Sequence, residues 1–285
     1  MNAPDKHAIR PRPPFANKRA LIYGAARGIG RAVALEFAHR GAELALADID
    51  VAGAKGTAAE IIKMGGRAIG LSCDVLSDEA VRAAAAEAER RLGELDIVMN
   101  NVGVILSGNP EDIPMSEWQR VLSLNLLSVV RSLEVFLPKM IARGAGHIVN
   151  TGSFAGLYPY ATNRMPYVAA KAAVVALSES LAVYLQPKGI RVSCLCPGPV
   201  ATQVMEGMKT WSVNAPMPGP GTQYRVKTAE EAASILADGM RDGRILIPTD
   251  EKVWEVVRHH ADSPDRFIQE KVDEFARGEW GRPGR

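Results

Sequence analysis

The stretch from Ala20 to Gly30, ALIYGAARGIG, joins an apolar run to a loop with glycine at positions 24, 28 and 30. The apolar run predicts a buried strand, and Ile29–Arg40 has the spacing of a helix that stops at a glycine. In this strand–loop–helix context the first glycine turns the chain. The second lets backbone N–H groups approach a diphosphate, and the third lets the helix pack against the strand. The loop therefore predicts a diphosphate site at a helix N-terminus.

Strands and helices alternate along the rest of the chain. We expect further strands at Glu43–Ala47, Arg67–Leu71, Asp96–Met99, Gly146–Asn150, Ile190–Cys196 and Ile245–Ile247. We expect helices at Val51–Met64, Ser77–Leu92, Ser116–Ile141, Pro166–Gln186 and Thr228–Asp242, the last opened by a T-x-x-E capping box. This alternation predicts an α/β protein with a doubly wound parallel sheet of about seven strands, a Rossmann fold. A single domain over 17–248 would follow a flexible N-terminal arm (1–16) and precede a C-terminal helical extension (249–285).

Composition excludes several classes of protein. Thirty-four Lys and Arg against 32 Asp and Glu give a net charge of +2, which argues against nucleic acid as a partner. No apolar run reaches the roughly 18 residues that span a bilayer, so we expect no membrane partner. Three cysteines exclude a disulfide framework and favour a cytoplasmic location. Cys194 and Cys196 share one strand face, but no second pair or nearby His completes a metal site.

Asp48 lies at the end of the second predicted strand, about 20 residues past the glycines. A carboxylate there accepts hydrogen bonds from the adenosine ribose and repels a 2′-phosphate, which favours NAD over NADP. Arg27 in the glycine loop is the opposing signal, because a cation there can hold a 2′-phosphate. We expect the repulsion from Asp48 to dominate.

Further motifs follow in order: Cys73-Asp74-Val75, Asn100-Asn101-Val102-Gly103, the set Asn125, Ser153, Tyr167 and Lys171, and Pro197-Gly198-Pro199-Val200-Ala201-Thr202. Together with the glycine loop they resemble the short-chain dehydrogenase/reductase family over roughly residues 18–248. Val102 departs from the alanine usual in the family. The resemblance implies that cofactor is bound by Gly24, Arg27, Gly28, Ile29, Gly30, Asp48, Asp74, Val75, Asn101, Val102, Gly103, Tyr167, Lys171, Pro197, Gly198, Val200 and Thr202.

Tyr167 and Lys171 are four residues apart and so share one face of a helix. A phenol has a pKa of about 10, and we expect the Lys171 ammonium and a nicotinamide ring to lower it. Tyr167 is then a credible acid/base at an alcohol or carbonyl oxygen, while Ser153 orients that oxygen. The resemblance implies that Lys171 also holds the nicotinamide ribose and that Asn125 holds a water of a proton relay.

Residues 203–227 change character, with methionine and aromatic side chains among prolines and glycines. In the family this region is a mobile substrate lid, and Met-rich surfaces adapt to irregular apolar ligands. The segment has few cations, which disfavours a phosphorylated or CoA-linked substrate. An alternative is that its hydrophobic residues only pack onto the body. The candidate substrate residues are Leu157, Tyr160, Met205, Met208 and Trp211.

Helix Ser116–Ile141 is apolar nearly all round. A sheet covers only one face of such a helix, so the other face predicts a subunit contact in a homodimer or homotetramer. The charged tail replaces a short glycine-rich ending usual in the family. It either covers the lid or caps a neighbouring subunit.

We therefore expect an NAD-dependent oxidoreductase that acts on CH–OH groups, interconverting a secondary alcohol and a ketone by hydride transfer. The features of residues 203–227 favour an apolar, cyclic or aromatic small molecule. An NADPH-dependent ketoreductase and a non-catalytic NAD(H)-sensing protein on the same fold remain alternatives. An epimerase or dehydratase is disfavoured by the short substrate region.

Overall fold

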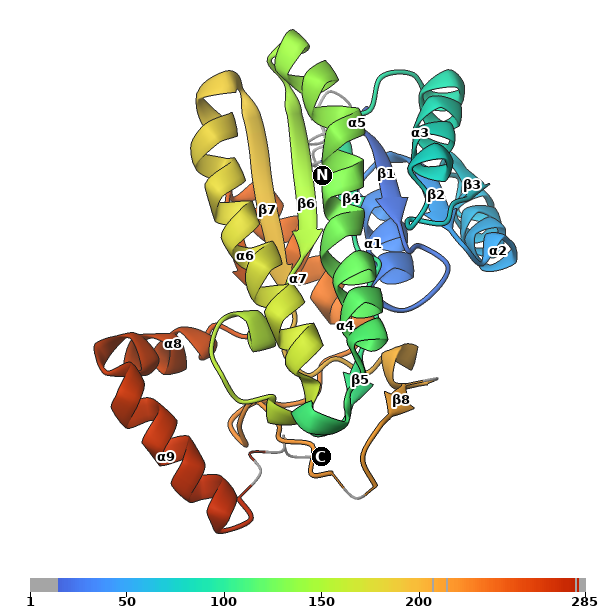
Figure 1. Cartoon of the computed structure of the whole chain (residues 1–285). Helices are drawn as coiled ribbons and strands as arrows, with labels where there is room; N and C mark the ends of the chain where they lie inside the picture. Colours follow the sequence, from blue (N-terminus) through green and yellow to red (C-terminus); the bar gives the residue numbers. More distant parts are fainter. Residues whose placement is uncertain (1–14, 207, 214, 280, 282–285) are drawn as a thin grey trace, which may run out of the picture.

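A seven-stranded parallel sheet in the order β3-β2-β1-β4-β6-β7-β9 forms the centre of the protein (Figure 1). The computed structural model describes residues 15–206, 208–213, 215–279 and 281. The strands are β1 (Arg19–Tyr23), β2 (Glu43–Asp48), β3 (Ala68–Ser72), β4 (Ile97–Asn100), β6 (Gly146–Thr151), β7 (Ile190–Cys196) and β9 (Leu246–Pro248). Every predicted strand is present, with each end within one residue of its expected place. The predicted α/β Rossmann architecture is confirmed.

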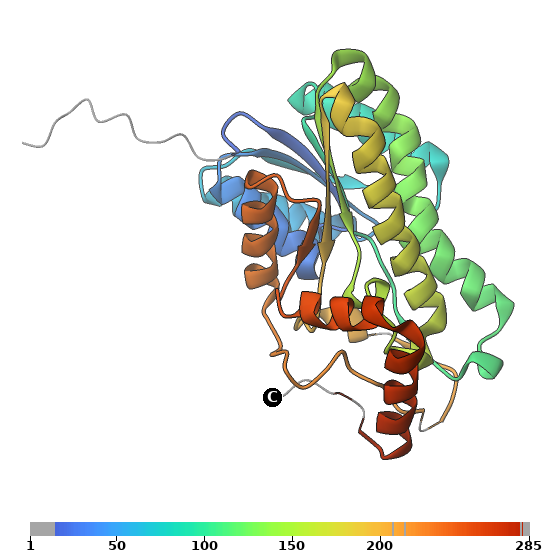
Figure 2. The same cartoon turned by 90° about the vertical axis from the view of Figure 1, so that its left-hand side faces the viewer.

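Helices cover both faces of the sheet (Figure 2). One face carries α1 (Gly28–His39), α2 (Val51–Lys63) and α7 (Ala229–Arg241). The other carries α3 (Asp78–Leu92), α4 (Met115–Leu122), α5 (Ser128–Arg143) and α6 (Met165–Leu185). Short helical turns lie at Pro110–Asp112, Phe154–Gly156, Thr162–Arg164, Gln186–Lys188 and Gln203–Met205. Because both faces are covered, the strands are apolar almost throughout, with Ala20–Tyr23 at most 2% exposed.

Side-chain caps fix where the helices begin. Asp50 accepts a hydrogen bond from Gly53 N at the start of α2, and Ser77 does so from Ala80 N at the start of α3. The predicted capping box of α7 is present, with Thr228 and Glu231 each bonding the other's backbone. Such caps satisfy N–H groups that have no partner within the helix.

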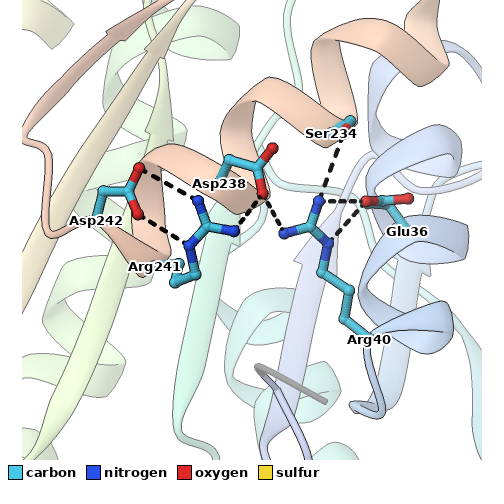
Figure 3. Close-up of polar contacts among 6 residues, drawn as sticks. All are labelled: Glu36, Arg40, Ser234, Asp238, Arg241 and Asp242. Carbon is cyan, nitrogen blue, oxygen red and sulfur yellow. Dashed lines mark hydrogen bonds and ion pairs between the residues drawn. The ribbon is translucent and has the colours of Figure 1, made fainter. Parts of the chain in front are cut away.

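An ion-pair network holds α7 against α1 (Figure 3). Arg40, whose side chain is 13% exposed, contacts Glu36 in its own helix and Asp238 in α7, at 2.6 and 2.7 Å. Arg241 reaches the same Asp238 carboxylate at 3.0 Å. The network ties the end of α1 to the helix that leads into β9.

Three features differ from the sequence predictions or were absent from them. The expected helix Ser116–Ile141 is not one regular helix, because a π-helical turn at Ser123–Leu127 separates α4 from α5. Two-residue strands β5 (Leu106–Ser107) and β8 (Lys209–Thr210) form a second sheet. Phe15, expected in the flexible arm, is 4% exposed and packs edge-on against Phe37. Residues 1–14 of that arm lie outside the described residues.

Two helical stretches, Met115–Arg143 and Thr162–Lys188, are long and apolar enough to cross a membrane by length and composition alone. The expectation that no stretch would reach that length was therefore wrong. Both stretches pack on the sheet through part of their surface, as core helices of a soluble fold also do.

The C-terminal extension consists of α8 (Val253–Asp262) and α9 (Pro264–Ala276). It lies beside the N-terminal end of α6 and the segment before it, at the carboxyl end of the sheet (Figure 1). Phe267 is 1% exposed, and its ring packs edge-on against Tyr158 with the centroids 6.4 Å apart. Gly221 N donates to Gly281 O at 2.7 Å. Of the two roles considered for the tail, contact with the predicted lid segment is the one present in the monomer.

Candidate active site

The glycine loop between β1 and α1 has the geometry of an anion cradle. Gly24 and Gly28 have φ of +78° and +57°, values that residues with a Cβ rarely adopt. A Cβ on Gly30 would lie 1.9 Å from Gly24 O, so only glycine fits there. The loop thus exposes backbone to a ligand at the N-terminus of α1, and it fits the diphosphate of a dinucleotide.

Asp48 at the end of β2 is held by backbone N–H groups. Its Oδ2 accepts from Ala26 N at 2.9 Å, and its Oδ1 accepts from Asp50 N at 3.0 Å. The carboxylate is thereby fixed directly beside the glycine loop. Arg27 is exposed and, among the described residues, forms no ion pair with Asp48 or another acid. The two charges that compete in the cofactor prediction are both at this corner of the site.

Asn101 ties the end of β4 to the glycine loop. Its Nδ2 donates to Gly24 O at 3.1 Å, and its Oδ1 accepts from the Thr151 hydroxyl at 3.2 Å. Val102 packs against Gly24, since a Cβ there would lie 3.1 Å from Val102 Cγ2. Asp74 caps the turn after β3 through Leu76 N, and Val75 beside it is 7% exposed.

A buried polar chain behind these residues was missed from the sequence. Asn100 donates to Asn150 Oδ1 at 2.9 Å, and Asn150 donates to the Ser178 hydroxyl at 3.0 Å. This chain of hydrogen bonds runs from β4 through β6 to α6 and fixes the two strands that carry the site. In the sequence, this hydrogen-bond chain is signalled only by the two asparagines Asn100 and Asn150, which stand at the ends of two predicted strands.

Ser153, Tyr167 and Lys171 come together at the carboxyl end of β6. Ser153 follows that strand and is 6% exposed; its hydroxyl accepts from Ala155 N at 3.2 Å and lies close enough to the Tyr167 phenol to influence the pKa of that group. Lys171, one turn along α6, is 3% exposed; its Nζ donates to Thr151 O at 2.7 Å and lies 5.7 Å from the Tyr167 ring centroid. The sequence-predicted catalytic set is thus one spatial cluster.

The electrostatics of this cluster differ from the prediction. Burial raises the pKa of Tyr167 above its usual value, and the neighbouring Ser153 hydroxyl and Arg164 guanidinium oppose the rise. Lys171, whose ammonium donates to Thr151 O, is not among the groups that lower this pKa here. The lowering by the ammonium together with a nicotinamide ring stays a prediction for the cofactor-bound protein. Burial also lowers the pKa of Lys171 to about 8. The ammonium is therefore itself close to titrating at neutral pH.

Asn125 lies in the π-helical turn and is 1% exposed. Its Nδ2 donates to Val104 O and Val121 O, and its Oδ1 accepts from Val104 N at 3.2 Å. A Cβ on Gly103 would lie 2.7 Å from Asn125 Oδ1 and 3.4 Å from Lys171 Nζ. The side chain thus braces the Gly103–Val104 backbone beside Lys171, and π-turns are frequent at functional sites.

The segment after β7, where the sequence predicts the nicotinamide contacts, packs against the turn that follows β6 and against the residue after β9. Pro197 O accepts from Phe154 N at 2.9 Å, and Gly198 N donates to the Thr249 hydroxyl at 2.9 Å. Thr202 packs against Gly28. Val200 forms a parallel bridge with Lys227. Thr249, a 3% exposed residue after β9, was missed because no motif includes it.

The predicted substrate residues lie on two sides of the site. Tyr160 is 8% exposed and Leu157 half-buried, both between Ser153 and α6. Met208 is half-buried, and Trp211, 41% exposed, follows β8 and packs over Gly108. The Met205 side chain lies outside what the structure describes. Cys194 and Cys196 share a face, with their Sγ atoms 3.9 Å apart, and no cluster of metal-ligating residues occurs in the described part of the chain.

Comparison with known proteins identifies the family. A family model described as short chain dehydrogenase matches residues 18–212. The chain belongs to the short-chain dehydrogenase family. The probable oxidoreductase EphD of Mycobacterium tuberculosis is 39% identical over 197 residues, which are 69% of this chain but 33% of EphD. The chain thus spans about a third of that relative's length.

Two other members of the family match over more of their own length. A cyclohexanol dehydrogenase of Acinetobacter sp. is 36% identical over 67% of this chain and 76% of its own. A crystal structure of a short-chain dehydrogenase/reductase from Burkholderia phymatum in complex with NAD has a TM-score of 0.78 at 29% identity. The match covers 88% of this chain and 95% of that one.

Proposed function

We propose that the protein is an NAD-dependent oxidoreductase that interconverts a cyclic secondary alcohol and the corresponding ketone. The observation that carries the proposal is the cluster of Ser153, Tyr167 and Lys171 beside the glycine cradle. A non-catalytic sensor of NAD(H) needs the cradle but has no use for this cluster. The similarity to a cyclohexanol dehydrogenase supports the cyclic substrate.

The chain's residues fit a nicotinamide dinucleotide. The glycine loop would hold the diphosphate, Asp48 the adenosine ribose, Asp74 and Val75 the adenine, and Pro197–Thr202 the nicotinamide. When bound, the cofactor accepts or donates the hydride. Ser153 donates a hydrogen bond to the substrate oxygen and orients it.

Tyr167 exchanges the proton at that oxygen. Its raised pKa in the free protein means that the phenol is protonated at neutral pH, which suits proton donation to a ketone. For alcohol oxidation the phenolate is needed, and a positive nicotinamide ring beside it would favour that form. Lys171 would hold the nicotinamide ribose. We place Asn125 as a positioning residue through its contacts with Val104, with the proposed relay water beside it.

The cofactor choice depends on Asp48 and Arg27. A 2′-phosphate beside a fixed carboxylate is repelled, while a free 2′-hydroxyl donates a hydrogen bond to it. We therefore expect kcat/KM to favour NAD by about tenfold or more, which corresponds to 1.4 kcal/mol or more. Asp48→Ser should narrow or reverse that preference. The exposed, unpaired Arg27 supports the second candidate, an NADPH-dependent ketoreductase, and equal or better use of NADP by the wild type would establish it.

The test is turnover of cyclohexanol with NAD and with NADP, followed by absorbance of the reduced cofactor. Turnover with NAD supports the proposal. Failure of a panel of cyclic, aromatic and acyclic secondary alcohols and ketones with either cofactor, despite measurable NAD binding, would favour the sensor.

We also propose a cytoplasmic homodimer or homotetramer that uses the outer faces of α5 and α6. Val130 in α5 and Val183 in α6 are 45 and 79% exposed, and Leu127, just before α5, is 43% exposed. Exposed apolar surface of this kind is costly in water and is typical of interfaces. A monodisperse monomer in sedimentation at micromolar concentration would contradict the contact.

A further inference from the structure

Arg164 is a cation in the wall of the site that the proposed chemistry does not use. It ends the turn Thr162–Arg164, stands immediately before α6 and lies three residues before Tyr167. Its guanidinium lies near enough to the catalytic phenol for its charge to act on that group. Its carbon is 5.8 Å from the ring centroid of Tyr160, the candidate substrate residue. Burial raises the pKa of both phenols, and the field of Arg164 opposes that rise at both.

The guanidinium has no anionic partner among the described residues. Its Nη2 donates to Pro218 O in the 203–227 segment. Its Nε is buried and has no hydrogen-bond partner, and in the described part of the chain no acceptor lies on Nη1. Burial of an unpaired donor on a charged group is unfavourable, because the donor loses its hydrogen bond to water and gains none in return.

The place of Arg164 at the start of α6 makes the lack of an anionic partner more unfavourable. Arg164 precedes the 21-residue helix α6, whose first turn holds no acidic residue. A helix N-terminus carries a partial positive charge, so a cation there is unfavourable unless an anion joins it. The Lys171 ammonium, 5.7 Å from the ring centroid of Tyr167, adds a second positive charge to the catalytic cluster, although it donates to Thr151 O. This wall of the site is therefore electropositive and short of acceptors.

We infer that Arg164 binds a carboxylate of the substrate, so that the substrate is a ring-bearing secondary alcohol or ketone that also carries a carboxylate. The planar guanidinium matches a carboxylate in shape and charge, and Nη1 is its available donor. A single cation suits one carboxylate better than a phosphate, which usually gathers several donors. This inference rests on the proposed function and narrows it. The expectation of a wholly apolar ligand came from the side chains of residues 203–227, whereas Arg164 contacts that segment through the backbone oxygen of Pro218 and adds a charge of its own.

The first experiment compares 3- and 4-oxocyclohexanecarboxylate with their methyl esters, each reduced with NADH. Wild type should prefer the acid to its ester by about tenfold or more in kcat/KM for at least one isomer. Arg164→Gln should lower that ratio at least tenfold, mainly through KM, since the group holds substrate and does not touch the reacting carbon. Arg164→Lys should recover part of it. The matched control is Arg90→Gln, because Arg90 pairs with Glu87 on the exposed face of α3, outside the substrate segment; its ratio should equal that of wild type.

A purely structural role predicts a different pattern. If Arg164 only anchors Pro218, Arg164→Gln loses activity equally on acid and ester, and the inference is overturned. A wild type that reduces the esters but shows no preference for either acid also overturns it, while the proposed function stands.

A binding measurement tests the role of Arg164 separately from the proposed oxidoreductase activity. Calorimetry with cyclohexanecarboxylate and the NADH-loaded protein should show binding at least tenfold tighter for wild type than for Arg164→Gln. This readout needs no turnover, so it tests Arg164 even if no cyclic ketone is reduced and the proposed function fails. Equal affinity, or no binding to wild type, would overturn the inference. If Arg164→Gln does not fold, as judged by circular dichroism, the wild-type comparison of acid with ester and the Lys variant decide it.

Discussion

The glycine loop (24–30) and the substrate segment (203–227) border the same site but are held in different ways. The loop is fixed by close backbone packing, with Gly30 against Gly24 O and Asp48 accepting from Ala26 N. The substrate segment is held by side chains and backbone from three distant parts of the chain. Lys209 pairs with Glu117, Tyr158 donates to Pro220 O, and Gly221 N donates to Gly281 O.

The glycine loop and the substrate segment are therefore ordered by different interactions. Backbone packing around glycines tolerates almost no change, because no side chain can rearrange to make space. Contacts through long side chains are individually weak, so the substrate segment can open piece by piece. We expect a substitution in the glycine loop to abolish cofactor binding altogether. Substitutions in the substrate segment should each weaken substrate binding by a small amount.

The largest effect is expected at the glycine loop. Gly30→Ala places a Cβ 1.9 Å from Gly24 O, and the overlap is with backbone that cannot move aside. We expect a loss of more than about 3 kcal/mol in the free energy of unfolding, together with loss of NAD binding. Gly56→Ala is the matched control, because nothing lies within 4 Å of a Cβ there in α2. That variant should gain about 0.5–1 kcal/mol, and equal behaviour of the two variants in urea unfolding would contradict the account.

The next effect concerns the C-terminal extension. Phe267 is the buried residue of α9, and Phe267→Ala should release that helix at a local cost of about 3 kcal/mol. Hydrogen exchange should rise in 264–276 and around 218–224, while the glycine loop stays protected. Ile268→Ala, at a position 44% exposed, is the control and should leave exchange unchanged. Loss of protection in the glycine loop would show that the two regions are not independent.

A smaller effect of opposite sign is expected at the junction of the two regions. Burial lowers the pKa of Lys171 from 10.5 to about 8, so the charged form destabilises the folded state. Between these values the unfolded chain binds more protons, and wild-type stability should rise as the pH rises from 8 to 10.5. Lys171→Met removes the unfavourable burial of the ammonium, but it also removes the hydrogen bond to Thr151 O. It should be more stable than wild type by about 2 kcal/mol at pH 7, and inactive.

Urea unfolding across this pH range measures the Lys171 effect. The Met variant should lack the stability gain between pH 8 and 10.5. A variant less stable than wild type at pH 7 would mean that the Thr151 contact outweighs the burial of charge.

The smallest effect is expected where the substrate segment meets α4. Lys209, 55% exposed, pairs with the nearly buried Glu117, which keeps Arg120 as a second partner. Lys209→Gln should therefore cost less than about 1 kcal/mol and show only as faster hydrogen exchange in 208–212. Lys209→Arg should restore protection. Global destabilisation would indicate that this segment is as tightly held as the glycine loop.

Much of the first half of the site was predictable from the sequence. The glycine spacing, Asp48 and Asn101 depend on a strand–loop–helix unit whose geometry is local, and every strand end lay within one residue of its predicted place. The catalytic cluster was also recognisable, because Tyr167 and Lys171 are one helical turn apart.

The features that the sequence did not predict depend on contacts between residues far apart in the chain. The π-turn at Asn125 arises where the side chain bonds Val104 and Val121, and no local pattern predicts it. The raised pKa of Tyr167 follows from how deeply three elements bury it, and the pairing of β5 with β8 joins residues about a hundred positions apart. Phe15 was assigned to a flexible arm because a single aromatic residue before the first strand has no periodicity.

The most direct test of the central claim follows the hydride and the proton together. Cyclohexanol deuterated at C1 should transfer deuterium to C4 of NAD in the wild-type protein. Tyr167→Phe should bind NAD normally but turn over about 10²–10⁴-fold more slowly, because the proton carrier is gone. Tyr184→Phe, which removes the hydroxyl of an exposed tyrosine of the same helix, should match wild type. Near-normal turnover of Tyr167→Phe, or oxidation of the alcohol without deuterium at the nicotinamide, would contradict the account.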